Sequence, residues 1–160
     1  MEQKHHPFSA VINSNSHILI LGTFPSVASI EQGFYYMHPQ NRFWKVLSRL
    51  YEEDVYSMGI EEKREFILRH QLALFDVISA CQIHKSSDQS IRFAEVQDIQ
   101  RIVELYPIKR ILLNGKKAYE LFKREYPDLL EMAVCLPSTS PANAKVSLEE
   151  LTAQWKKWLF

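Results

Sequence analysis

The sequence predicts a three-layer α/β/α fold built on a four-stranded parallel sheet. Short apolar runs alternate along the chain with longer segments whose apolar residues recur at helical spacing. Strands separated by helices pair in parallel through right-handed crossovers. A length of 160 residues favours a single domain, which we take as residues 1–160 with residues 1–16 as an N-terminal extension.

Four segments have the pattern of short buried strands. The run at 110–113 is nearly all apolar at its end, which is typical of a strand covered on both faces. The predicted strands are 17–21, 74–78, 108–113 and 132–136. Residues 82–90 are predicted to form a polar loop.

Helices are predicted between these strands and at the end of the chain. The segment 93–105 ends before Pro107, as expected because a residue preceding proline disfavours helix. Ser147 and Glu150 have the spacing of a capping box at the start of the last helix. The predicted helices are 41–51, 60–70, 93–105, 115–126 and 147–158.

Composition and charge exclude several classes of protein. Apolar residues make up 46% of the chain and charged residues 24%, and 19 basic residues balance 19 acidic ones, so no global field favours nucleic acid or a membrane. No apolar run reaches the ~18 residues that a membrane span needs, and the N-terminus lacks a signal-peptide core. Cys81 and Cys135 are isolated, so we expect reduced core residues, no structural metal and a cytoplasmic protein.

Three loops that follow strands carry the polar and aromatic residues of interest. They are residues 22–41, 114–117 and 136–143, and they supply amides, hydroxyls, aromatic rings and two lysines. They lack a carboxylate pair, a Ser-His-Asp set and a glycine-rich phosphate loop. Because parallel strands end at the same edge of a sheet, these loops should meet there and form a pocket suited to a planar heterocycle.

Structural roles alone explain some of these residues. Asn41 precedes a helix and is a good N-cap, and the hydroxyls of 138–140 between two prolines fit a rigid turn. Asn114 ends an apolar strand and needs hydrogen-bond partners. Lys116 begins a helix, where a cation is unfavourable unless an anion is near, which favours phosphate contact.

The loops also carry a family resemblance. Residues 34–47, 111–114 and 136–142 resemble motifs of the uracil-DNA glycosylase superfamily. The combination of 22–26, 35–44 and 138–143, supported by 75–81 and 87–91, resembles its hypoxanthine-DNA (deoxyinosine) glycosylase branch. Phe24 stands where most of the superfamily has the Asp or Asn that handles the attacking water, whereas that branch places its catalytic amide at the position of Asn41.

The resemblance implies a monofunctional enzyme that hydrolyses the bond between a deaminated base and deoxyribose, the first step of base excision repair. The nucleotide must be flipped out of the duplex. The implied catalytic residue is Asn41; the base-binding residues are Gly22, Thr23, Phe24, Pro25, Tyr36, His38 and Asn114; and the DNA-binding residues are Ser138, Thr139, Ser140, Asn143 and Lys116. No metal or cofactor is implied.

We expect Asn41 to orient the water, because an amide does not titrate near neutral pH and cannot act as an ordinary general base. Asp88 is the rival water activator. Tyr36 is the expected stacking surface. The expected partner is DNA containing a deaminated base, with no membrane contact and a monomeric protein.

Three alternatives stay open. The enzyme could instead act on uracil or mismatched thymine. Because Phe24 replaces the usual catalytic residue, the chain could be a non-catalytic module that binds damaged DNA or nucleotides. A plain α/β module for protein contacts is the third, although it leaves the amides and hydroxyls at three strand ends unexplained.

Overall fold

The computed structural model describes residues 2–83 and 91–160 and contains the predicted parallel sheet. Its strands are β2 (Ile18–Gly22), β3 (Leu72–Asp76), β6 (Arg110–Asn114) and β7 (Ala133–Leu136), in the order β3-β2-β6-β7. All three pairings are parallel. The four-stranded parallel sheet and its α/β class are therefore confirmed.

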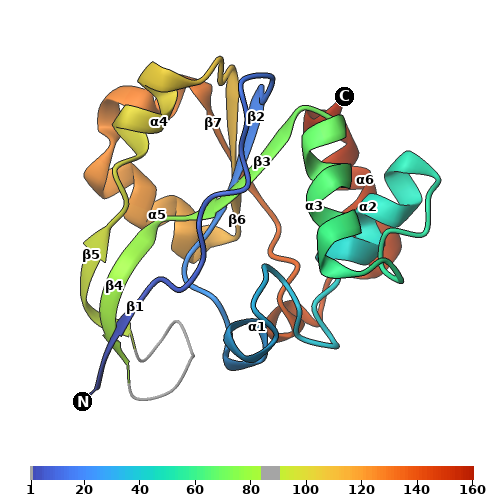
Figure 1. The fold of residues 1–160 in the computed structure, drawn as a ribbon, viewed down its shortest axis with the longest axis horizontal. Coiled ribbons are helices and arrows are strands. Elements are labelled where there is room, and N and C mark those ends of the chain that lie inside the picture. Colours follow the sequence, from blue (N-terminus) through green and yellow to red (C-terminus); the bar gives the residue numbers. More distant parts are fainter. Residues whose placement is uncertain (1, 84–90) are drawn as a thin grey trace.

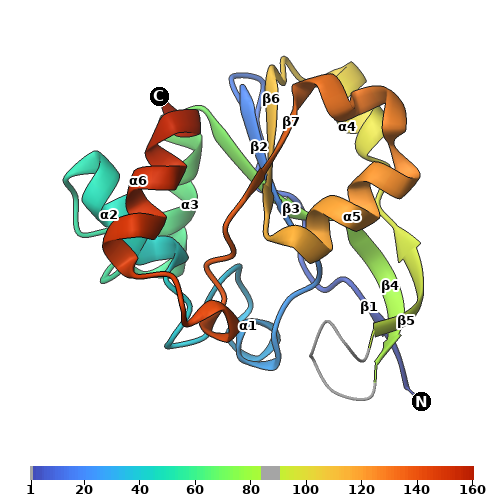
Figure 2. The ribbon, with the colours of Figure 1, turned by 180° about the vertical axis from the view of Figure 1, so that it is seen from behind.

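Helices cover both faces of this sheet (Figures 1 and 2). On one side lie α2 (Phe43–Tyr51), α3 (Ile60–Arg69) and α6 (Leu148–Leu159), and on the other lie α4 (Ile99–Leu105) and α5 (Lys116–Glu125). Successive strand residues point to opposite faces. Accordingly Ile20 belongs to the α2 side of the core and Leu19 and Leu21 to the α5 side.

A second, antiparallel sheet was not predicted. It consists of β1 (Glu2–His5), β4 (Ile78–Ile83) and β5 (Ile91–Val96), in the order β1-β4-β5. The predicted helix 93–105 is wrong in its first half, because residues 91–96 form a strand that pairs with β4. Residues 82 and 83 also belong to β4, whereas the rest of the predicted loop, 84–90, lies outside the described residues.

The chain passes from one sheet to the other at Val77, so the predicted strand 74–78 is in fact the end of β3 and the start of β4. The Val77 amide donates to the Gly22 carbonyl (2.8 Å), and the Ile78 amide donates to the Thr23 carbonyl (3.0 Å). These two bonds tie the end of β2 to the crossing point. Asp76 is consequently the last residue of β3.

The remaining short elements surround the carboxyl ends of the parallel strands or follow α5. Helix α1 (Val27–Gln32) interrupts the predicted loop 22–41; Ser26 caps it and Gly33 ends it in a left-handed conformation (φ 81°). Two 3-10 turns are η2 (Pro127–Met132) and η3 (Pro141–Asn143).

The structure bears on two expectations from the composition, the burial of the cysteines and the membrane span. Cys135 is exposed, so its predicted place in the core is wrong; it lies on β7, an edge strand with a neighbour on one side only. The side chain of Cys81 lies outside the description. Among the described helices, none has the length and apolar character to cross a bilayer.

Candidate active site

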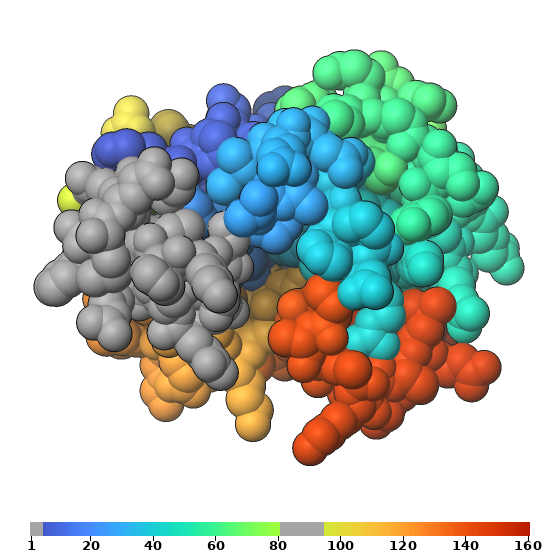
Figure 3. All heavy atoms as spheres, turned by 90° about the horizontal axis from the view of Figure 1, so that it is seen from below, coloured from blue at the N-terminus to red at the C-terminus, as the bar shows by residue number. Residues whose placement is uncertain are grey.

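A pocket of about 530 Å³ lies at the carboxyl ends of the parallel strands. β2 is the first strand of this sheet along the chain, and it lies between β3 and β6, which are reached by separate crossovers. Open α/β sheets bind ligands at the end of a strand in this position. Figure 3 shows the hollow between the segment around α1 and the segment around η3. The pocket is lined by 22–26, Ser29, Tyr35, Tyr36, His38, Asn41, Asp76, Asn114 and 138–142.

Most of the predicted site residues line this one pocket. The structure brings together Asn41, all seven predicted base-binding residues, and Ser138, Thr139 and Ser140. Lys116 and Asn143 are not part of the pocket wall. Asp88 lies outside the described residues.

Gly22 brings the backbone of β2 into close contact with two polar atoms. A Cβ atom at this position would lie 2.6 Å from Asp76 Oδ1 and 3.1 Å from the Tyr36 hydroxyl. Real Cβ contacts are almost never below 3.0 Å, so only glycine fits without movement. The close approach keeps Asp76 and Tyr36 near the end of β2, on the pocket wall.

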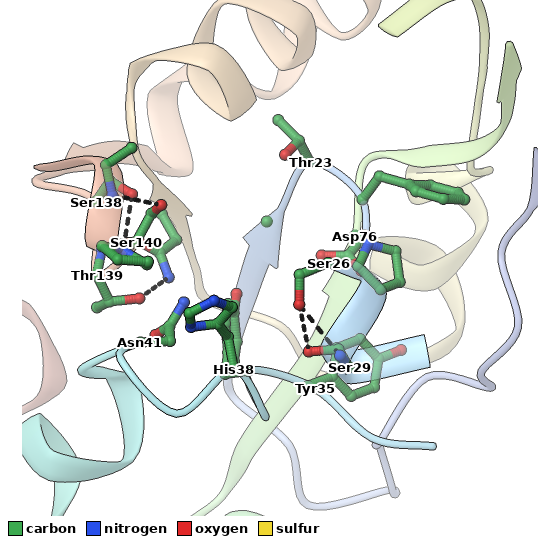
Figure 4. Close-up of a pocket in the computed structure, with 17 residues that line it drawn as sticks. Thr23, Ser26, Ser29, Tyr35, His38, Asn41, Asp76, Ser138, Thr139 and Ser140 are labelled. Carbon is green, nitrogen blue, oxygen red and sulfur yellow. Dashed lines mark hydrogen bonds between the residues drawn. The ribbon is translucent and has the colours of Figure 1, made fainter. Parts of the chain in front are cut away.

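Asn41 lies on the pocket wall just before α2, near His38 and the loop 138–140 (Figure 4). Its Oδ1 accepts a hydrogen bond from the Phe43 backbone amide (2.9 Å), and the Asn41 backbone amide donates to the His38 carbonyl (2.9 Å). The side chain therefore supports the helix start and lines the pocket at the same time. A carboxamide oxygen has two lone pairs, so one remains for a water molecule.

Arg42 joins the start of α2 to the loop that follows β7. Its backbone amide donates to the Thr139 carbonyl (3.0 Å), and its guanidinium donates to the carbonyls of Asn143 (2.9 Å) and Val146. The two sides of the pocket are thus bonded to each other beside Asn41. This geometry fixes Asn41 relative to the loop predicted to contact DNA.

Asn114 and Thr139 hold the third side of the pocket. Asn114 Nδ2 donates to Thr139 Oγ1 and Asn114 Oδ1 accepts from the Thr139 amide, both at 2.9 Å, and Thr139 is fully buried. The hydrogen-bond partners that Asn114 needs at the end of β6 are therefore supplied by Thr139, in the loop that follows β7. Its second amide hydrogen takes part in neither of these two bonds.

Replacing Asn114 with alanine should loosen this loop. The change removes both bonds and leaves the Thr139 amide without its acceptor, which costs about 1–3 kcal/mol for a buried group. Thermal unfolding should show a lower Tm, and DNA affinity should fall with it. An Asn114→Ala protein with unchanged Tm would show that these bonds do not stabilise the loop.

Two tyrosines, together with Phe24, form the aromatic part of the wall. The Tyr36 ring stacks on Phe43 (ring centroids 4.2 Å apart), and Tyr36 adopts a left-handed backbone (φ 58°) that is unusual for a bulky residue. Burial, followed by the negative charge of Asp76, raises the pKa of both the Tyr35 and Tyr36 phenols well above the usual range. Both hydroxyls therefore stay neutral at any physiological pH.

Asp76 is a buried, charged pocket residue that was not predicted from the sequence. It is only 3% exposed, and its Oδ2 lies 2.8 Å from Nε2 of His6, which the N-terminal segment brings to the pocket. A carboxylate that ends an otherwise apolar run was a detectable signal, because it falls at the ligand-binding edge of the sheet. Assigning the strand to 74–78 placed it in the middle of a strand and concealed that signal.

Two predicted DNA-binding residues lie beside the pocket. Asn143 Nδ2 donates to the Ser138 carbonyl (3.0 Å), so this side chain helps to shape the loop. Lys116 begins α5 and is exposed, next to Gly115, whose Cβ position would lie 3.0 Å from the Ser138 Cβ. Their roles toward DNA remain predictions.

Comparisons with known proteins identify the family. The Uracil DNA glycosylase superfamily matches residues 9–159. Two Methanosarcina proteins named Hypoxanthine DNA glycosylase are similar to this chain. The one from M. acetivorans is 33% identical over 154 residues (93% of this chain, 94% of that protein), and the one from M. barkeri is 35% identical over 118 residues (73% and 75%).

A solved structure agrees with the sequence matches. It is the solution NMR structure of an M. acetivorans protein proposed to be a uracil DNA glycosylase. It matches with a TM-score of 0.85 and 31% sequence identity, covering 99% of this chain and 97% of that one. The chain belongs to the uracil DNA glycosylase superfamily.

Proposed function

We propose that this protein is a monofunctional DNA glycosylase that releases hypoxanthine from deoxyinosine in DNA. The observation that carries the proposal is the position of Asn41, an amide on the wall of a pocket large enough for an extruded purine nucleotide. The names of the two Methanosarcina relatives support hypoxanthine as the base. The protein would act as a monomer in the cytoplasm.

The reaction breaks the bond between the base and C1′ of deoxyribose, and water adds to C1′. Positive charge develops on the sugar and negative charge on the departing base, as in other glycoside cleavages. Asn41 Oδ1 would accept a hydrogen bond from the attacking water and hold it against C1′, which supplies orientation. Backbone amides around Thr23 and Phe24 would stabilise the charge on the base.

The rest of the pocket would hold the flipped nucleotide. Flipping costs a few kcal/mol, and less for a base that pairs imperfectly, as hypoxanthine does. The Tyr36 ring would stack on the base, and Asn114 would bond to its edge. Ser138, Ser140 and Lys116 would contact the flanking phosphates.

Base release from a panel of oligonucleotides tests the proposal. Duplexes that carry one hypoxanthine, uracil, mismatched thymine or adenine are incubated with the protein, and abasic sites are revealed with alkali. We expect hypoxanthine to be released fastest and the strand to stay intact until alkali is added.

Each other outcome selects one of the competing functions. Faster release of uracil or of mismatched thymine would assign the chain to those substrates. Tight binding of the hypoxanthine duplex without abasic sites would identify a non-catalytic binding module. Strand cleavage before alkali would contradict the monofunctional reaction.

A further inference from the structure

A histidine from outside the parallel sheet holds the carboxylate in the pocket. His6 Nε2 lies 2.8 Å from Asp76 Oδ2, and the two side chains are 4% and 5% exposed. His6 directly follows β1, the strand that pairs with β4, and its amide donates to the Ser79 carbonyl (2.7 Å). The second sheet therefore carries His6 to the end of β3.

The His6 imidazole also contacts the chain through its second ring nitrogen and its ring faces. Its Nδ1 lies 2.9 Å from the Phe8 carbonyl oxygen, so each ring nitrogen faces an oxygen atom. Four aromatic rings surround it, with centroid distances between 5.3 and 5.9 Å: Phe8, Phe24, Tyr35 and Phe75. The ring is thereby held in one orientation toward Asp76.

The second oxygen of Asp76 faces the end of β2. Its Oδ1 lies beside Gly22, where a Cβ would come within 2.6 Å, and Asp76 lines the pocket. Within residues 2–83 and 91–160, Oδ2 has His6 as its partner, and no hydrogen bond is formed to Oδ1. Because Asp76 lines the pocket, a donor on a bound ligand can reach Oδ1, and a hydrogen bond to a carboxylate is stronger than one to a neutral group.

We propose that His6 is a positioning residue that acts through Asp76: it holds Oδ2 so that Oδ1 accepts a hydrogen bond from a ring N–H of the extruded base. This inference rests on the proposed function and adds a basis for its specificity. Hypoxanthine carries a hydrogen on N1, whereas N1 of adenine is an acceptor and would place a lone pair against the carboxylate. The deaminated purine is therefore favoured over adenine, the normal base from which it forms.

Affinity measurements test the role of His6 directly. In an Asn41→Ala background that blocks cleavage, Kd is measured for duplexes that carry hypoxanthine or adenine at one position. His6→Ala should weaken hypoxanthine binding by about 10- to 100-fold, the effect of losing a hydrogen bond that involves a charged group, and should change adenine binding much less. His6→Gln, which keeps an N–H donor, should restore part of the preference.

His5 provides the matched control, because it is the neighbouring histidine and is exposed. His5→Ala should leave both Kd values unchanged. With Asn41 restored, His6→Ala should raise KM for the hypoxanthine duplex and change the saturating single-turnover rate by less than about threefold, because His6 does not touch the reacting atoms. Thermal unfolding of each variant identifies any that fail to fold.

The outcomes separate this inference from the proposed function. Equal hypoxanthine-to-adenine preference in the parent and His6→Ala proteins would overturn the role of His6, whether or not the wild type releases base. If His6→Ala does not fold, His6→Gln carries the test, and a folded His6→Gln protein with no preference for hypoxanthine would also overturn it. A wild type that binds hypoxanthine duplexes selectively without releasing base would refute the glycosylase alone.

Discussion

Replacement of Asn41 with alanine should lower the single-turnover rate of hypoxanthine release by about 10²- to 10³-fold, the usual effect of removing one group that orients or stabilises a reacting atom. The change removes the amide oxygen that we assign to the attacking water, while the pocket wall and the loop 138–142 remain in place. DNA affinity should therefore stay close to that of the wild type. Single-turnover kinetics and a separate Kd measurement distinguish the two quantities.

Gln40 supplies the control for this experiment, because it is the adjacent residue, is exposed and lies outside the pocket. Gln40→Ala should release base at the wild-type rate. Asn41→Ala also loses the hydrogen bond to the Phe43 amide, which costs about 0.5–1.5 kcal/mol of stability. Tm therefore has to be measured alongside the rate. Full activity in Asn41→Ala would remove this residue from the mechanism.

Gly22→Ala should cause the second large loss of activity. Its Cβ would lie 2.6 Å from Asp76 Oδ1 and 3.1 Å from the Tyr36 hydroxyl, so the carboxylate, the tyrosine or the strand end must move. Overpacking of this kind costs about 1–3 kcal/mol, and a displacement of about 1 Å at a catalytic site lowers rates by about 10²-fold. Base release and thermal unfolding measure the two effects.

Gly59→Ala is the matched control for this substitution. A Cβ at Gly59 meets only Glu62 Oε1, at an ordinary 3.7 Å, and the residue caps α3 away from the pocket. This variant should retain wild-type activity and lose about 0.5–1 kcal/mol of stability, because alanine is a poorer N-cap than glycine. A fully active Gly22→Ala protein would show that the Asp76–Tyr36 arrangement is not needed for catalysis.

The sequence was sufficient to predict the parallel sheet because its signals are local. Apolar runs such as 18–21 and 110–113 and the amphipathic pattern of α5 each specify one element, and the rule for parallel strands then brings their ends together. For the same reason the loops 22–41 and 136–143 could be assigned to one pocket without knowledge of any contact.

The second sheet depends on contacts that no local pattern reveals. β1 pairs with β4 although about 75 residues separate them in the chain, and the short run of β5, IRFAEV, lacks strict alternation and also fits the start of a helix. His6 was missed for the same reason, since its pairing with Asp76 exists only when this sheet forms. The Arg42 bonds to the loop after β7 likewise link residues 97 or more positions apart.

Asn41 shows that a structural role and a functional role need not exclude each other. Its Oδ1 accepts from the Phe43 amide at the start of α2, although the N-cap residue is Arg42 and not Asn41 as predicted, and Asn41 still lines the pocket. The local bond orients the side chain, which is what a group that positions water requires. Sequence spacing alone treated these roles as alternatives.

A comparison of Asn41→Ala with Asp76→Asn shows which group guides the water, because the pocket contains a neutral amide and a carboxylate and either is capable of this role. The measurement is the single-turnover rate of hypoxanthine release at saturating protein, with Kd determined separately. We expect a rate loss of about 10²- to 10³-fold for Asn41→Ala, and for Asp76→Asn mainly a weaker Kd. A large rate loss in Asp76→Asn together with a nearly normal rate in Asn41→Ala would contradict this expectation and assign the water to the carboxylate.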